Sequence, residues 1–152
     1  ALRLDRRAML STLRQAHMDL VELERWRTDP QSHLNTAADA IYMLVMRHAE
    51  DLTPVAPALL SRLRQMPRYF SEACECLDRP DPLWQNLAVK AAPAVGAMFT
   101  SLDEPLARAL GKTPTQIASV TRRAAAAAAD YARHTEALAP APAPRGDRAG
   151  EE

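Results

Sequence analysis

Proline is the residue that most constrains the fold of this chain. Twelve of the 152 residues are proline and only four are glycine, and most prolines lie between segments whose apolar residues recur every three or four positions. The residue before a proline is disfavoured in a helix, whereas proline itself suits the first helical turn, so these prolines separate consecutive helices. No segment alternates apolar and polar residues as a strand does. The sequence therefore predicts an all-α fold, a bundle-like array of six or seven mostly antiparallel helices joined by short turns.

The apolar spacing predicts where these helices lie. The expected helices cover residues 2–26, 34–50, 57–65, 67–77, 82–102, 104–110 and 114–138. The first is long and amphipathic. The centre of the second, IYMLVM at 41–46, is apolar on all sides, so we expect it to be the most buried element. Pro67 is expected to open a new helix, and Pro93 is expected to kink the helix in which it lies near residues 89–92.

The clearest helix start lies at Thr113, which is followed by Pro114 and then by Gln116 at the third helical position. This order is typical of a capping box. Six consecutive alanines further along raise the helix propensity of this segment and allow a neighbouring helix to come close. We expect one helical domain over residues 1–139. Residues 140–152 are expected to form a Pro/Ala-rich linker that ends in a charged tail.

Composition and charge exclude several classes of partner. Apolar residues make up 47% of the chain and charged residues 25%, and the 19 basic and 19 acidic side chains cancel. Nucleic-acid-binding proteins normally carry a clustered basic surface, so no nucleic-acid partner is expected. No run of about 18 apolar residues is present, so no membrane partner is expected. The N-terminus lacks both an apolar signal region and an initiator Met, which predicts a processed or trimmed end.

The two cysteines, Cys74 and Cys76, do not form a metal-binding motif. Structural zinc takes four Cys or His ligands, and no second pair follows. Two residues apart on a helix, the two side chains point about 200° apart, which also disfavours a disulfide between them. We expect Cys74 to pack in the core and Cys76 to be partly exposed. Two cysteines make no disulfide framework of the secreted kind, which favours a cytoplasmic protein.

None of the four histidines lies in a catalytic or metal-binding motif. A zinc-peptidase helix needs His-Glu-x-x-His, in which both histidines share one face and the glutamate polarises the water. The string HAED at 48–51 lacks both the glutamate position and the second histidine. Structural or solvent-facing roles are therefore expected for all four. These histidines are His17, His33, His48 and His134.

Arg62, Arg64 and Arg68 form a modest basic cluster beside Tyr69. One interpretation is a solvated helix face with the alkyl stems lying along the helix. The alternative is a contact with an anionic group, such as a substrate carboxylate or a neighbouring domain. These four residues are the candidate interface residues, and no catalytic or metal-ligating residue is predicted.

The segment that contains this cluster, residues 59–77, has the sequence LLSRLRQMPRYFSEACECL. Its order of apolar residues, Arg-Leu, proline and aromatic residue, followed by an acidic proline turn and Trp84, resembles the bacterial DUF 885 family, a domain of unknown function. In that family a Trp-x-x-(Asp/Asn)-Pro turn and an apolar helix precede the segment, as do residues 26–30 and 34–47 here. An Ala-rich helix and a Gly-Asp…Gly-Glu-Glu string follow it, as at 146–152 here.

The resemblance implies a helical fold related to zinc metallopeptidases of the gluzincin and carboxypeptidase Taq type. In that family the zinc-binding His-Glu-x-x-His helix lies downstream of the matched region, so the resemblance implies no catalytic residue or metal ligand in this chain. We expect the non-catalytic N-terminal helical half of such a protein, either a fragment, a split subunit or a relative that lost its catalytic half. It would line the cleft and dock on a catalytic half that holds zinc. No cofactor is expected in this chain itself.

Two other functions stay open. The alternative is a stand-alone helical scaffold or interaction protein that homo-oligomerises through an Ala-rich or Met-rich face, and an uncovered apolar face would be its signature. A third hypothesis is an enzyme complete in this chain. Its site would be built from Glu, Asp, His and Arg side chains, with His48 and His134 as the first candidates.

Overall fold

A computed structural model describes residues 2–141 of the chain, with side chains from residue 5 onward. No strand occurs in this part, so the predicted all-α fold is confirmed. The elements are α1 (Leu2–His17), the π-helix η1 (Met18–Glu22), α2 (Arg25–Thr28), α3 (Pro30–Arg47), α4 (Ala56–Cys76), α5 (Pro82–Thr100), α6 (Asp103–Ala109) and α7 (Pro114–Ala137). Most of the predicted tail, including the Gly-Asp and Gly-Glu-Glu strings of the family resemblance, lies outside the described residues.

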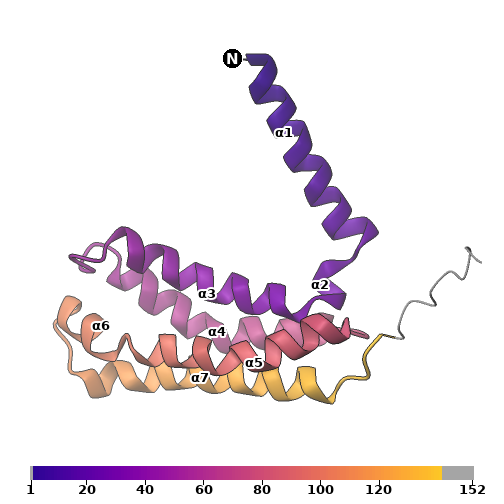
Figure 1. The fold of residues 1–152 in the computed structure, drawn as a ribbon. Helices are drawn as coiled ribbons and strands as arrows, with labels where there is room; N and C mark the ends of the chain where they lie inside the picture. The colour runs from indigo at the N-terminus through magenta and orange to yellow at the C-terminus, as the bar shows by residue number, and fades with distance from the viewer. Residues whose placement is uncertain (1, 142–152) are drawn as a thin grey trace, which may run out of the picture.

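Four long helices, α3, α4, α5 and α7, pack into a bundle (Figure 1). α7 packs against α4, α5 and α6, and α3 packs against α4 and α5. Burial of a large apolar side chain stabilises a fold by roughly 1.5–3 kcal/mol, so the interior of this bundle is the main source of its stability. The largest buried apolar and aromatic side chains include Leu34, Leu59, Phe70, Phe99 and Tyr131.

Local capping sets the ends of the later helices as predicted. At the start of α7, the Thr113 backbone N–H donates a hydrogen bond to Gln116 Oε1 at 3.1 Å, which is half of a capping box. At the start of α5, Asp81 Oδ1 accepts a hydrogen bond from the Leu83 N–H at 2.8 Å. α6 is followed by Gly111 with φ of +61°, a left-handed conformation that glycine adopts without strain.

α3 begins earlier than predicted, at Pro30 rather than at residue 34. Pro30 lies in the first turn, where its missing N–H leaves no helical bond unmade. Asp29 Oδ1 caps this turn by accepting a hydrogen bond from the Ser32 N–H at 3.0 Å. The Pro30 carbonyl also accepts a hydrogen bond from the buried Tyr131 hydroxyl at 2.8 Å. A contact of such long sequence separation lies beyond the reach of local spacing.

The predicted helix break at Pro67 is wrong, because α4 continues from Ala56 to Cys76 with Pro67 in its interior. An interior proline removes one backbone hydrogen bond and crowds the carbonyl four residues before it, at a cost of about 3 kcal/mol. Side chains on both sides of the proline, such as Leu63 and Phe70, lie in one hydrophobic core. Burial of this continuous stripe outweighs the cost of the proline. Pro93 lies inside α5, as predicted, and the kink expected there stays a prediction.

The expectation that residues 41–46 are the most buried element is also wrong. Ile41 is fully buried, but Tyr42, Met43 and Met46 are 48%, 46% and 54% exposed. α3 lies at the edge of the bundle, where α4 and α5 cover one of its faces. An apolar sequence on all sides of a helix therefore does not ensure burial on all sides, since each face needs a neighbour.

Candidate interaction surface

The N-terminal segment, α1 followed by η1, projects away from the bundle (Figure 1). We call residues 2–23 the arm. Every side chain from Asp5 to His17 is exposed. The sequence predicts one amphipathic helix over residues 2–26, but α1 ends at His17, η1 follows, and the chain turns at Glu24. The bundle is thus complete without the arm.

The arm carries an apolar stripe that nothing in the described chain covers. Met9, Leu13, Leu20 and Val21 are each about 60–65% exposed. An isolated helix of this length is only marginally stable in water, and an amphipathic helix normally gains its stability by packing its apolar face on a partner. An exposed apolar surface of this kind is typical of an interaction site.

The charges on the arm are separated along its length. Arg6, Arg7 and Arg14 lie in α1, whereas Asp19 and Glu22 lie in η1. The arm therefore has a basic tip and an acidic base. Such an arrangement gives a helical docking element a preferred direction, because a partner helix with the same polarity binds better antiparallel than parallel.

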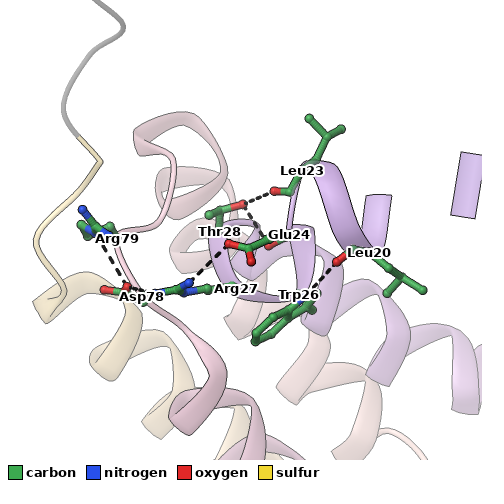
Figure 2. Close-up of polar contacts among 8 residues, drawn as sticks. All are labelled: Leu20, Leu23, Glu24, Trp26, Arg27, Thr28, Asp78 and Arg79. Carbon is green, nitrogen blue, oxygen red and sulfur yellow. Dashed lines mark hydrogen bonds and ion pairs between the residues drawn. The ribbon is translucent and has the colours of Figure 1, made fainter. Parts of the chain in front are cut away.

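A set of hydrogen bonds forms the elbow between the arm and the bundle (Figure 2). Glu24 adopts a left-handed backbone conformation with φ of 44°. The Trp26 indole N–H donates to the Leu20 carbonyl at 3.1 Å, and Thr28 Oγ1 lies 3.3 Å from the carbonyl oxygens of Leu23 and Glu24. These bonds span the turn, so they hold the arm at a defined angle to α2.

The bundle side of the elbow is fixed by the loop before α5. Arg27 Nη2 donates to Asp78 Oδ2 at 2.5 Å, and Arg27 Nη1 lies 3.3 Å from Glu24 Oε2. The hydrogen bond with Asp78 raises the pKa of Arg27 above its usual value. Backbone bonds add to this link, because the N–H groups of Asp78 and Asp81 donate to the carbonyls of Arg27 and Thr28, both at 3.0 Å. The base of the elbow therefore moves with the bundle.

A second uncovered surface lies on α3. Asp39, Tyr42, Met43 and Met46 are all exposed, and we call them the α3 stripe. Their positions differ by three, four and seven residues, which places them on one face of the helix. The bundle therefore presents an apolar surface in addition to the arm.

The structure does not bring the four predicted interface residues together. Arg62 donates to the Ala40 carbonyl and lines a groove of about 220 Å³ with Tyr69. Arg64 lines a different groove, of about 300 Å³, because side chains two residues apart on a helix point in nearly opposite directions. Arg68 Nε lies 2.7 Å from Glu72 Oε1. A single anionic contact built from all four residues stays a prediction.

Tyr69 acts as a link between helices in this arrangement. Its hydroxyl donates to the His33 carbonyl at 3.2 Å, which joins α4 to α3. Burial raises the pKa of Tyr69. The side chain therefore has a structural partner, and its position beside Arg62 follows from helix packing.

The two cysteines lie as predicted, with Cys74 partly buried against the core and Cys76 exposed. Cys74 shares a groove of about 350 Å³ with Asp130 and His134. Within residues 2–141, no hydrogen bond joins this thiol to His134. Burial, and to a lesser degree the charge of Asp130, raises the pKa of Cys74. A raised pKa disfavours the thiolate, which is the nucleophilic form, so this groove is not assigned a catalytic role.

The histidines are placed separately. His33 Nε2 lies 2.8 Å from the Trp26 carbonyl, which adds another contact to the elbow, and His17 Nδ1 lies 3.8 Å from Glu22 Oε1. Among the described residues, no three His, Cys, Asp or Glu side chains lie close enough to hold a metal ion. The described helices also include none that is long and apolar enough to cross a membrane.

No protein-family model, curated protein or solved structure matches this chain. The resemblance to the DUF 885 family stays a prediction. The sequence alone indicated the amphipathic pattern of the arm, but it did not indicate the elbow or the exposure of the α3 stripe. The only local signal for the elbow was the polar, proline-terminated string at residues 26–30, which marked the end of a helix and not its change of direction.

Proposed function

We propose that this chain is a non-catalytic helical scaffold protein that associates with a second copy of itself through the arm. The observation that carries this proposal is the exposure of the arm along its described length, with an apolar stripe on an amphipathic helix. The bundle provides a rigid support, and the elbow presents the arm to a partner.

The energetics favour a partner for the arm. Full burial of a Leu, Met or Val side chain contributes about 1.5–3 kcal/mol, and about two-thirds of the Met9 and Leu13 side chains is exposed. Burial of several such residues supplies enough free energy to offset part of the entropy lost on association. A helix of this length gains helical stability at the same time.

Sedimentation velocity on the purified chain over a wide dilution range tests this function. We expect the wild type to form a dimer of twice 16.7 kDa. Leu13→Asp should raise the dissociation constant about tenfold or more, because it places a charge in a buried seam. Leu83→Asp is the matched control, since Leu83 is 61% exposed and lies on α5. A wild type that stays monomeric at every concentration contradicts the proposal.

A second proposal follows the resemblance to DUF 885. In it, the arm docks on a separate catalytic half that carries the His-Glu-x-x-His helix and its zinc ion. The uncovered arm also supports this proposal, because such a half needs a docking surface. The two proposals differ in the oligomeric state of the isolated chain. A monomer that binds a defined His-Glu-x-x-His chain at equal stoichiometry, and loses it in Leu13→Asp, favours the second.

A further inference from the structure

We propose that the arm docks on the α3 stripe of a second copy, and that the two copies exchange arms reciprocally. This inference rests on the proposed function, because it names the surface that receives the same arm. Both surfaces are exposed and apolar in the described chain, with Met43 and Met46 as the centre of the stripe. Each would bury what the other leaves uncovered.

The spacing of the two surfaces is that of helices that pack together. The residues of the α3 stripe occur at positions i, i+3, i+4 and i+7. On the arm, Met9, Leu13 and Ala16 recur at steps of four and three. This alternation is the pattern of a helix–helix seam, in which side chains of one helix insert between those of the other.

The two surfaces also match in length. Met9 precedes the elbow residue Glu24 by about 15 positions, and Met46 follows Pro30 by about 16, or about 22–24 Å in each case at a rise of 1.5 Å per residue. When the arm lies antiparallel to α3 with Met9 beside Met46, Leu13 lies beside Tyr42. The apolar residues of the two helices then coincide.

The charges favour this antiparallel direction. With Met9 beside Met46, Arg6 lies beside Glu50, and Asp5 lies within one helical turn of Arg47. A parallel arrangement with the same apolar contacts would instead place Asp19 beside Glu50. Like charges brought together at an interface disfavour that arrangement, so the polarity of the arm selects the antiparallel one.

The elbow decides that the acceptor belongs to a second copy. For the arm to fold back on its own α3, the contacts that span the elbow would have to break. They include the bond from the Trp26 indole to Leu20, at 3.1 Å, and the ion pair of Arg25 Nε with Asp19 Oδ1, at 3.4 Å. In an exchanged pair these contacts are kept. Each copy gives one arm and receives one, so the assembly closes as a two-fold dimer.

Substitution on the acceptor side separates this inference from the proposed function. We expect Met46→Asp to raise the dissociation constant of the dimer about tenfold or more in sedimentation velocity. Leu87→Asp is the control, since Leu87 on α5 is 41% exposed and should leave dimerisation unchanged. A dimer that is lost in Leu13→Asp but unaffected by Met46→Asp would mean that arms pair with arms. That result overturns the inference and leaves the proposed function standing.

Crosslinking tests which copy receives the arm. In a chain with Cys74→Ser and Cys76→Ser, one sample carries Met9→Cys and another carries Met46→Cys. We expect mild oxidation of the mixture to give a crosslinked dimer, and Leu83→Cys in place of Met46→Cys to give none. If the chain with both new cysteines yields only an intrachain disulfide at all concentrations, the arm binds its own α3 and the inference fails.

Two further outcomes overturn the inference. A wild-type monomer at every concentration removes both the exchange and the proposed self-association. The basic tip of the arm also suits an anionic lipid surface, so the wild type is mixed with vesicles of phosphatidylserine and phosphatidylcholine. If Leu13 is needed for vesicle binding and the chain is monomeric without vesicles, the partner of the arm is a membrane surface.

Discussion

The buried hydroxyl of Tyr131 donates a hydrogen bond to the carbonyl of Pro30 at 2.8 Å, across 101 residues of sequence. This bond joins the last part of α7 to the first residue of α3, next to the elbow. The Tyr131 ring also lies 5.3 Å from that of Phe70, measured between centroids. The position at which the arm leaves the bundle therefore depends on an interior contact between the first and last bundle helices.

Replacement of Tyr131 by Phe should lower the free energy of unfolding by about 1–3 kcal/mol, because the Pro30 carbonyl would stay buried without this partner. Urea denaturation followed by circular dichroism measures the change. Tyr42→Phe is the control, since Tyr42 is 48% exposed and its hydroxyl can bond to water. An equal loss in both variants would show that the Tyr131 bond contributes nothing specific.

Alkaline pH should destabilise the fold through its buried tyrosines. Burial raises the pKa of both Tyr131 and Tyr69, so both stay protonated in the folded state when an unfolded chain would ionise them at about pH 10. Their contribution is complete below that pH and is lost as the pH rises above it. The free energy of unfolding should fall more steeply above about pH 10 in the wild type than in Tyr131→Phe. Parallel curves would contradict this assignment.

Gly96 tests how closely α5 and α7 approach each other. A Cβ atom at this position would lie 3.5 Å from the Ala125 Cβ, which is an ordinary van der Waals contact. Gly96→Ala should therefore raise the free energy of unfolding by about 0.5–1 kcal/mol, because alanine favours the helix. Gly96→Leu should lower it by about 1–3 kcal/mol, since the larger side chain would overpack the interface. Thermal denaturation of the two variants should shift in opposite directions.

Pro67 tests the cost of the interrupted hydrogen-bond ladder in α4. Pro67→Ala supplies an N–H for the Leu63 carbonyl and removes the crowding by the ring. We expect the free energy of unfolding to rise by about 1–3 kcal/mol. Pro57→Ala is the control, because Pro57 lies in the first turn of the same helix and interrupts no bond there. A loss of stability in Pro67→Ala would show that packing of the ring outweighs the backbone term.

The sequence predicted those features that depend on residues close in the chain. The starts of α5 and α7 follow from Asp81 before Pro82, and from Thr113 with Gln116. The opposite directions of Cys74 and Cys76 follow from helical geometry alone. All-helical composition followed in the same way, because proline spacing and apolar periodicity act within a few residues.

Only the tertiary structure decided which surfaces are covered. Pro67 lies within one helix because the core spans it, and Tyr42 and Met46 are exposed because α3 lies at the edge of the bundle. Arg62 and Arg64 line separate grooves because different neighbours flank α4. The amphipathic pattern of the arm is local, but its exposure is set at the elbow. Capping and helix periodicity act between neighbours in sequence, whereas burial requires another helix in contact, and the sequence pattern of one helix does not contain its partner.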